Sequence, residues 1–157
     1  MNAIIEELEV SFPAGGSCAV RAVYEPTDPF AVQLQFNVPR EAGDCGAAAP
    51  AGADEDVDQW TTWVFARDLL ALGMNKHLAS MRMQVGEGTI ALGPGPTGDQ
   101  ITVVLCPADP GKRVVMYIRR AELEELLVRS VQLVPFGQES TRLDLDEEFR
   151  ALLRKSA

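Results

Sequence analysis

The segment DQWTTWVFARDLLALG, residues 58–73, decides how this chain is read, because it holds both tryptophans and a change from strand to helix. Side chains alternate between the two faces of a strand, so Trp60 and Val64 share one face while Trp63 and Phe65 share the other. Both faces then carry large apolar groups. This pattern predicts a strand that is covered on both sides.

The letters ARDLLALG at the end of this segment predict a short helix. Asp68 falls in its first turn, where the helix dipole favours a carboxylate. Gly73 is placed to end the helix in the left-handed conformation. A helix of two turns is not stable alone, so we expect Leu69, Leu70 and Leu72 to hold it by packing.

The same segment supplies the candidate site residues. Arg67 and Asp68 are either an exposed pair that recognises a protein partner, or a surface or bridging arginine beside a helix-start carboxylate, and both interpretations stay open. A stacking platform for single-stranded nucleic acid would need both tryptophans on one face, which the alternation does not give. The residues predicted to form the core of the fold or an interface are Trp60, Trp63, Phe65, Leu69 and Leu70.

Alternating apolar residues elsewhere predict further strands. Including the opening segment, about seven strands are expected, at residues 8–12, 18–24, 30–36, 60–65, 81–85, 100–106 and 112–118, with a short extended piece at 89–91. Amphipathic helices are predicted at 120–130, with Leu123, Leu126 and Leu127 on the apolar side, and at the C-terminus. In the C-terminal helix Asp144 and Glu147 form a capping box, and the apolar face consists of Leu145, Phe149, Leu152 and Leu153.

The fold class that follows is α+β, a mostly antiparallel sheet packed with helices. Residues 1–157 are expected to form one domain, interrupted at 38–57 by an acidic Ala/Gly/Pro loop that cannot bury apolar surface. The strands at 60–65, 100–106 and 112–118 have two apolar faces, yet few helices are available to cover them. Oligomerisation would resolve this mismatch.

Composition limits the function classes. Hydrophobic residues make up 46% of the chain and the net charge is -9, which argues against a footprint on duplex DNA. Three cysteines without a C-x-x-C pair fit a reducing cytoplasm, and no apolar run is long enough to span a membrane. We therefore expect a cytoplasmic protein.

The sequence offers no catalytic, cofactor or metal site. GPGPTG at 93–98 matches G-x-G-x-x-G, but its prolines remove amides that a dinucleotide needs and a strand pattern follows, so it is interpreted as a connecting loop. His77 is the sole histidine, and no cysteine stands in a nucleophile motif. DEDVD at 54–58 lacks the glycine and terminal glutamate of a calcium loop.

Three segments occur in the order and spacing of a known family: DPFAVQLQF at 28–36, WVFARDLLALG at 63–73 and LDLDEEFRALL at 143–153. Through them the chain resembles the SsgA-like proteins, the sporulation and cell-division proteins of filamentous actinobacteria. The resemblance covers nearly the whole chain, and its middle segment is the most specific. The stretches at 38–57 and 131–142 are longer than the family pattern suggests.

The resemblance implies a non-enzymatic adaptor. Family members mark septum sites and recruit the tubulin-like protein FtsZ, while others act in septal peptidoglycan remodelling. The implied partners are FtsZ and other SsgA-like proteins at the septum, with any membrane contact made through them. The family fold is similar to the whirly type and assembles as a trimer, which agrees with the two-faced strands.

The alternative is a single-stranded nucleic-acid-binding protein with the same whirly-like fold. It would need a basic groove, to which Arg113, Arg119, Arg120 and Arg129 could contribute. Glutamates are interleaved with these arginines in the sequence.

Overall fold

The computed structural model describes residues 2–37, 60–77, 85–87, 89–143 and 145–155. Within these residues the strands form one eight-stranded sheet in the order β4-β3-β2-β1-β8-β7-β6-β5, and every neighbouring pair is antiparallel. The strands are β1 (Ile4–Ser11), β2 (Ser17–Tyr24), β3 (Ala31–Asn37), β4 (Trp60–Ala66), β5 (Val85–Glu87), β6 (Ile90–Pro94), β7 (Gln100–Leu105) and β8 (Val114–Arg119). The helical elements are α1 (Arg67–Gly73), α3 (Arg120–Leu133), the 3-10 turn η2 (Glu139–Arg142) and α4 (Leu145–Lys155).

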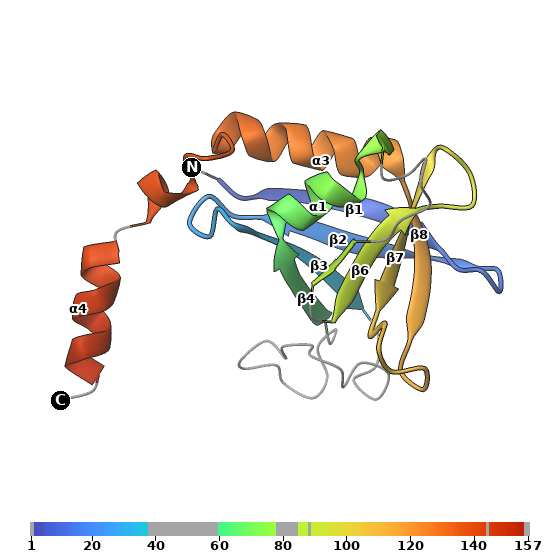
Figure 1. Cartoon of the computed structure of the whole chain (residues 1–157), viewed down its shortest axis with the longest axis horizontal. Helices are drawn as coiled ribbons and strands as arrows, with labels where there is room; N and C mark the ends of the chain where they lie inside the picture. The colour runs from blue at the N-terminus through green and yellow to red at the C-terminus, as the bar shows by residue number, and fades with distance from the viewer. Residues whose placement is uncertain (1, 38–59, 78–84, 88, 144, 156–157) are drawn as a thin grey trace.

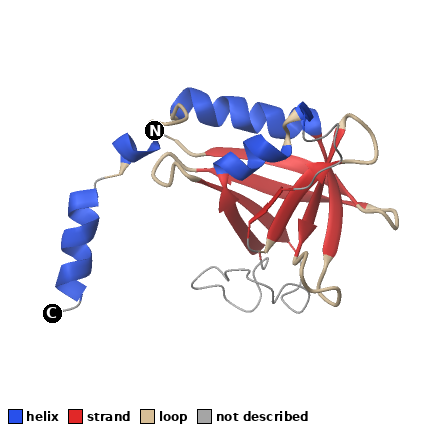
Figure 2. Ribbon diagram, viewed as in Figure 1, coloured by secondary structure: helices blue, strands red, loops and turns tan. Residues whose placement is uncertain are grey.

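The sheet is strongly curled, and α1 and α3 lie along the same side of it (Figure 1). Figure 2 shows both helices above the strands, while α4 stands apart from the rest of the chain. The α+β class and the largely antiparallel sheet predicted from the sequence are confirmed. The described sheet has one strand more than expected, because the extended piece near residue 90 forms a full strand, β6.

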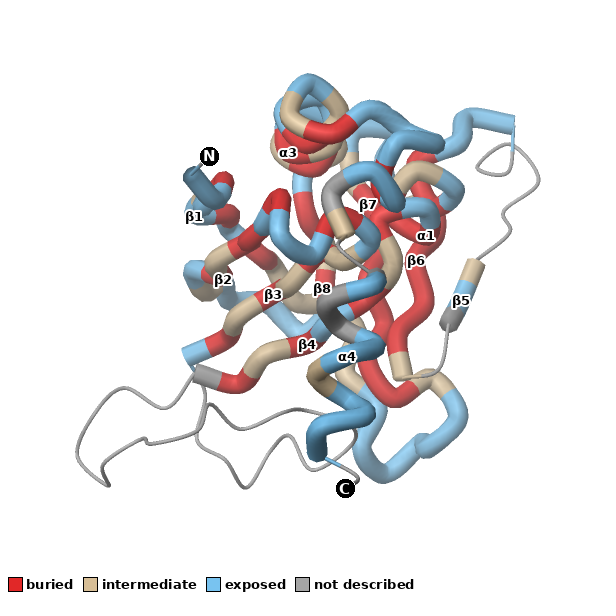
Figure 3. Tube along the Cα trace, turned by 90° about the vertical axis from the view of Figure 1, so that its left-hand side faces the viewer, coloured by how far each residue is buried: buried red, intermediate tan, exposed pale blue. Residues whose placement is uncertain are grey.

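Alternation along β1 and β3 builds the core as predicted, and β2 adds a run of buried residues at its C-terminal end. Leu8 lies opposite Val20 and Leu34 lies opposite Trp63, and all four side chains are at most 4% exposed. Buried and partly exposed positions alternate along β3 in Figure 3. The core is therefore made by the inner face of the curled sheet and the undersides of α1 and α3.

Within the single chain, β4 is covered on one face only. Trp63 and Phe65 are buried on the inner face, but Val64 on the outer face is 54% exposed. β4 is an edge strand, so the predicted cover of its outer face would have to come from another chain and stays a prediction. Trp60 begins β4, but its side chain lies outside the described part of the structure.

By contrast, β7 is covered on both faces as expected, since residues 101–105 are all buried. It lies inside the sheet between β6 and β8. The segment GPGPTG joins β6 to β7 by a tight turn, in which the Gly95 amide donates to the Gln100 carbonyl at 3.0 Å. The interpretation as a connecting loop is confirmed.

Helix α1 differs from its prediction at two positions. Leu72 is 48% exposed, whereas Leu69 and Leu70 are buried as expected. Gly73 is the last helical residue, and the cap position is taken by Met74 with a right-handed conformation. A Cβ atom on Gly73 would lie 2.6 Å from Leu92 Cβ. The glycine is therefore required for the close approach of α1 to β6 and not for a left-handed turn.

The two longer helices form where they were predicted. Leu123 and Leu126 are buried under α3 and Leu127 packs at the edge of the core. α4 has its apolar residues on one face, but Phe149, Leu152 and Leu153 are all more than 60% exposed. The 38–57 loop, the acidic run at 54–58, residues 81–84 of the predicted fifth strand and the Asp144 cap lie outside the described residues.

Candidate functional site

Arg67, the first residue of α1, is buried although it carries a permanent charge. Only 1% of its surface is exposed. Its Nη1 donates hydrogen bonds to the Tyr24 hydroxyl at 3.1 Å and to the carbonyls of Ser130 at 3.2 Å and Val134 at 2.6 Å. Nη2 donates to Glu139 Oε1 at 2.5 Å. These contacts match the rule that a buried charge is paired and hydrogen-bonded.

Arg67 also caps α3. The last carbonyls of a helix have no partner within it, and a cation near them is favoured by the helix dipole. The last turn of α3 contains no basic residue, and Arg67 supplies the missing cation from another element. It thereby fixes how α1 meets the end of α3.

Two aromatic rings complete the surroundings of this guanidinium. Its Cζ lies 4.4 Å from the centroid of the Phe136 ring and 5.2 Å from that of Tyr24, within the range of cation–π attraction. The Tyr24 hydroxyl donates in turn to the Pro29 carbonyl at 3.2 Å. We call this set of residues the Arg67 hub: Tyr24, Arg67, Ser130, Val134, Phe136 and Glu139. The hub joins β2, α1, α3 and η2.

Ionisation in the hub follows from these contacts. Burial alone would raise the pKa of the Glu139 carboxyl, but hydrogen bonds from backbone groups and from Arg67, together with the Arg67 charge, bring that pKa below its ordinary value. Burial raises the pKa of the Tyr24 hydroxyl, although Arg67 opposes the shift. Glu139 is therefore ionised at neutral pH, and Tyr24 is neutral.

The structure separates the two members of the predicted Arg67–Asp68 pair. Asp68 is exposed, but Arg67 points into the protein, so the expectation of an exposed arginine is wrong, and the bridging interpretation describes its contacts. The protein-interaction role stays a prediction, and Asp68 is the member that a partner can reach. Trp63, Phe65, Leu69 and Leu70 all belong to the core.

Sequence reasoning missed Tyr24, Phe136 and Glu139 as functional neighbours of Arg67. Glu139 is 72 positions away along the chain, in a stretch with no clear periodicity. One feature of the sequence did point to these neighbours. Arg67 stands between a strand and a helix whose other buried positions are apolar. Such an arginine needs a buried acceptor, but the sequence did not say which residue provides it.

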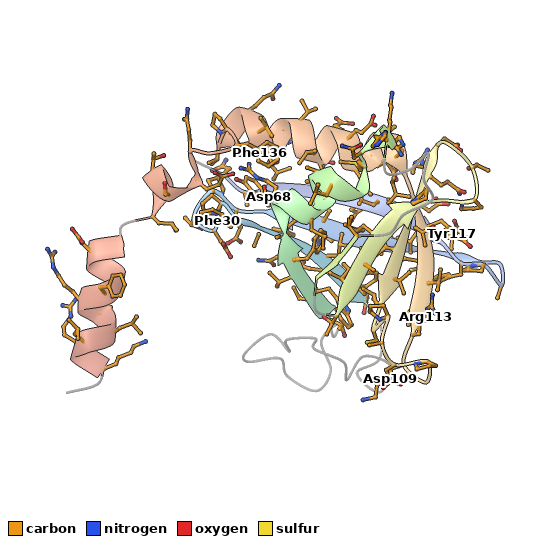
Figure 4. All side chains as sticks on the ribbon, in the orientation of Figure 1. Phe30, Asp68, Asp109, Arg113, Tyr117 and Phe136 are labelled. Atoms are coloured by element: carbon orange, nitrogen blue, oxygen red, sulfur yellow. The ribbon has the colours of Figure 1, made fainter. Side chains whose placement is uncertain are left out.

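Two aromatic side chains remain half exposed around the hub. Phe136 covers the guanidinium and is 42% exposed, and Phe30, whose carbonyl accepts from the Arg67 amide at 2.7 Å, is 49% exposed. Figure 4 shows Phe30, Asp68 and Phe136 at the same end of the sheet. A surface of this kind suits contact with another protein.

Comparison with known proteins agrees with this architecture. The family described as "Streptomyces sporulation and cell division protein, SsgA" matches residues 18–139. The chain belongs to this SsgA family. The match takes in the Arg67 hub from Tyr24 to Glu139.

Several relatives of this family member are named sporulation-specific cell division protein SsgB. The Thermobifida fusca protein is 31% identical over 82% of this chain and 75% of its own length. The Frankia casuarinae protein is 30% identical over 93% of this chain and 87% of its own length. The Streptomyces coelicolor protein is 30% identical over 85% of this chain and 80% of its own length.

Solved structures of the family share the fold. A crystal structure of an SsgA-like sporulation-specific cell division protein from Thermobifida fusca has a TM-score of 0.66 and 25% identity, covering 96% of this chain and 94% of its own. A structure of SsgB from Streptomyces coelicolor has a TM-score of 0.64 and 24% identity, covering 90% of this chain and 96% of its own. At 24% identity, the similarity to the Streptomyces coelicolor structure shows a shared fold alone.

Three of the arginines that the nucleic-acid alternative requires are paired with carboxylates in this SsgA family member. Arg119 lies 2.6 Å from Glu122, Arg120 lies 3.6 Å from Glu124, and Arg129 pairs with Glu6. Each pair neutralises charge that a phosphate backbone would otherwise attract. The described surface therefore gives this alternative little support.

No group of three or more His, Cys, Asp or Glu side chains could hold a metal ion within the described part of the chain. His77 is exposed, Cys18 is half-buried and Cys106 is buried. Among the described helices, none is long and apolar enough to cross a membrane.

The buried Arg67–Glu139 ion pair makes the free energy of unfolding depend on pH. The pKa of Glu139 is lowered in the folded state. The stabilisation that its carboxylate provides is therefore present above the unfolded-state pKa of about 4.3, and it is lost as the pH falls through the folded-state pKa. We expect Glu139→Gln to reduce the free energy of unfolding at neutral pH and to flatten its decline in acid. Urea unfolding from about pH 7 to about pH 3 measures both effects. An unchanged acid slope would contradict this assignment.

Proposed function

We propose that this protein is a non-enzymatic adaptor in sporulation-specific septation. It localises or recruits the division machinery, FtsZ in particular, to septum sites, or it guides septal peptidoglycan remodelling. It works as a homo-oligomer, a trimer with a whirly-like fold, that is cytoplasmic and recruited to the septum. The observation that carries the proposal is the family match over residues 18–139, supported by relatives named sporulation-specific cell division proteins.

The outer face of α1 is the surface we assign to the partner. Asp68 and Leu72 are exposed, and their spacing of four residues places them on one side of the helix. Leu72 is 48% exposed, so the face offers an apolar side chain one turn away from a carboxylate. The Arg67 hub lies directly beneath and holds the first turn of α1 in place.

A pull-down with purified FtsZ, and with other SsgA-like proteins, tests this function. We expect the chain to retain at least one of these proteins. Asp68→Lys combined with Leu72→Ser should weaken retention by about tenfold or more, since central interface side chains dominate binding. If every candidate partner fails to bind the unaltered chain, the adaptor function is wrong.

The matched control is Glu125→Lys combined with Val128→Ser. These two residues are also an exposed acid and an exposed apolar side chain about one turn apart, on the outer face of α3. The control pair should retain the partner as the unaltered chain does. Equal losses from both pairs would mean that α1 is not the specific surface.

A further inference from the structure

Helix α4 presents an apolar face that is mostly exposed to solvent. Phe149 is 63% exposed, Leu152 62% and Leu153 70%, and the helix stands away from the sheet (Figure 1). An isolated helix of 11 residues is only marginally stable in water, because most helical stability comes from packing. A covering surface would stabilise this helix as well as bury its apolar side chains.

One surface of the same chain has the matching chemistry. Phe30 and Phe136 are the exposed aromatic side chains outside α4 among the described residues. The Arg67 hub holds them together, since Arg67 contacts Phe136 and the Phe30 carbonyl, and Tyr24 bonds to Pro29. We call the surface formed by Glu25, Asp28, Phe30 and Phe136 the phenylalanine patch.

Charges on the patch and on the C-terminal half of α4 are complementary, whereas the first turn of the helix carries the exposed acid Asp146. Glu25 and Asp28 are exposed in the turn that precedes Phe30. α4 carries Arg154 and Lys155 in its last turn, and Arg150 is exposed one turn earlier. An apolar contact flanked by opposite charges fixes the orientation of a docking helix.

The course of the chain favours docking on a different copy. Glu139 is held by Arg67, η2 ends at Arg142 and α4 begins at Leu145. To cover its own patch, the helix would have to turn back immediately after η2, but it runs away from the sheet instead (Figure 1). Another copy can take up the helix without such a reversal.

We infer that α4 of one copy docks its Phe149–Leu153 face on the phenylalanine patch of a second copy. This inference rests on the self-association in the proposed function and names its contact. Helix and patch are different surfaces, so the contact is heterologous and closes a ring when the rotation permits. Each copy in that ring gives one helix and accepts one.

Disulfide trapping between two differently sized versions of the full chain tests the contact. One carries Phe30→Cys and the other Leu152→Cys, both with Cys18→Ser and Cys45→Ser, while the buried Cys106 is kept. After mixing and mild oxidation, we expect the mixed-size dimer on a non-reducing gel. Val128→Cys, at a residue 54% exposed on α3, replaces Phe30→Cys in the control and should link far less.

Two results would overturn the inference. One is a yield of mixed-size dimer no higher than the yield from the Val128→Cys control. The other is a chain carrying both Phe30→Cys and Leu152→Cys that closes a disulfide within itself while the mixture stays unlinked, because α4 would then cover its own patch.

A second measurement avoids introduced cysteines. Phe149→Ser with Leu153→Ser should lower the mass in light scattering to that of one chain and leave the thermal midpoint of the sheet domain unchanged. An unaltered chain that is already a single copy, or a double variant of unchanged mass, would contradict the docking. These experiments need no FtsZ, so their failure and a failed FtsZ pull-down are separate results.

Discussion

Arg67→Ala is expected to lower the free energy of unfolding by about 3–5 kcal/mol, the range for removing one partner of a buried ion pair. The substitution leaves Glu139 buried without its cation, uncaps the end of α3 and removes the support beneath Phe136. For a chain of this size, that loss corresponds to a fall in the thermal midpoint on the order of 10 °C. Urea unfolding and a thermal melt followed by circular dichroism measure it.

Asp68→Ala is the matched control for this prediction. Asp68 is the next residue in the same helix and is exposed, so its loss should change the free energy of unfolding by about 0.5 kcal/mol or less. If the two substitutions have equal effects, Arg67 does not organise the fold. A stable Arg67→Ala protein that only loses its partner would instead show that the arginine acts in recognition.

The double variant Arg67→Met with Glu139→Leu separates the ion pair from its surroundings. Replacing both members of a buried pair by apolar residues often costs less than removing one. We expect the double variant to be more stable than Arg67→Ala. The remaining deficit would measure the bonds from Arg67 to Tyr24 and to the Ser130 and Val134 carbonyls.

The strands were predictable because alternation is a local property. The pattern around Leu8, Leu34 and Trp63 predicts the inner face of the sheet without reference to any other part of the chain. The pairing of β1 with β8, where Val10 lies opposite Ile118, was not predictable from that pattern. It joins the two halves of the sheet at its centre, and no short-range feature encodes which distant strands become neighbours.

The candidate site was predictable only in part, for a related reason. The sequence drew attention to Arg67, because the residues around it read as a buried strand and helix. Whether an arginine there is exposed or buried depends on an acceptor supplied by Glu139, far along the chain, and by the end of α3. Burial of Arg67 is a consequence of tertiary structure, and the pattern of residues 58–73 alone could not decide it.

Gly73→Val is the second substitution expected to have a large effect, with a loss of about 3 kcal/mol from overpacking. A Cβ at residue 73 would meet the Cβ of Leu92 at 2.6 Å, and neither atom can rotate away, since both are fixed to their backbones. In an exposed helix, replacing glycine usually stabilises by up to about 1 kcal/mol. At Gly73 the clash outweighs this gain, so the sign of the effect is itself a test.

The control for Gly73→Val is Gly98→Val. Gly98 lies in the exposed turn between β6 and β7, and a Cβ there meets no atom within 4 Å, so we expect a change of about 0.5 kcal/mol or less. Leu92→Gly removes the Cβ atom that a side chain at residue 73 would meet, at a cost on its own of at least the roughly 2–5 kcal/mol of a Leu→Ala change. Combined with Gly73→Val, the two losses should therefore be clearly less than additive, as for residues in direct contact. Additive losses, or a stable Gly73→Val protein, would mean that α1 does not depend on its close approach to β6.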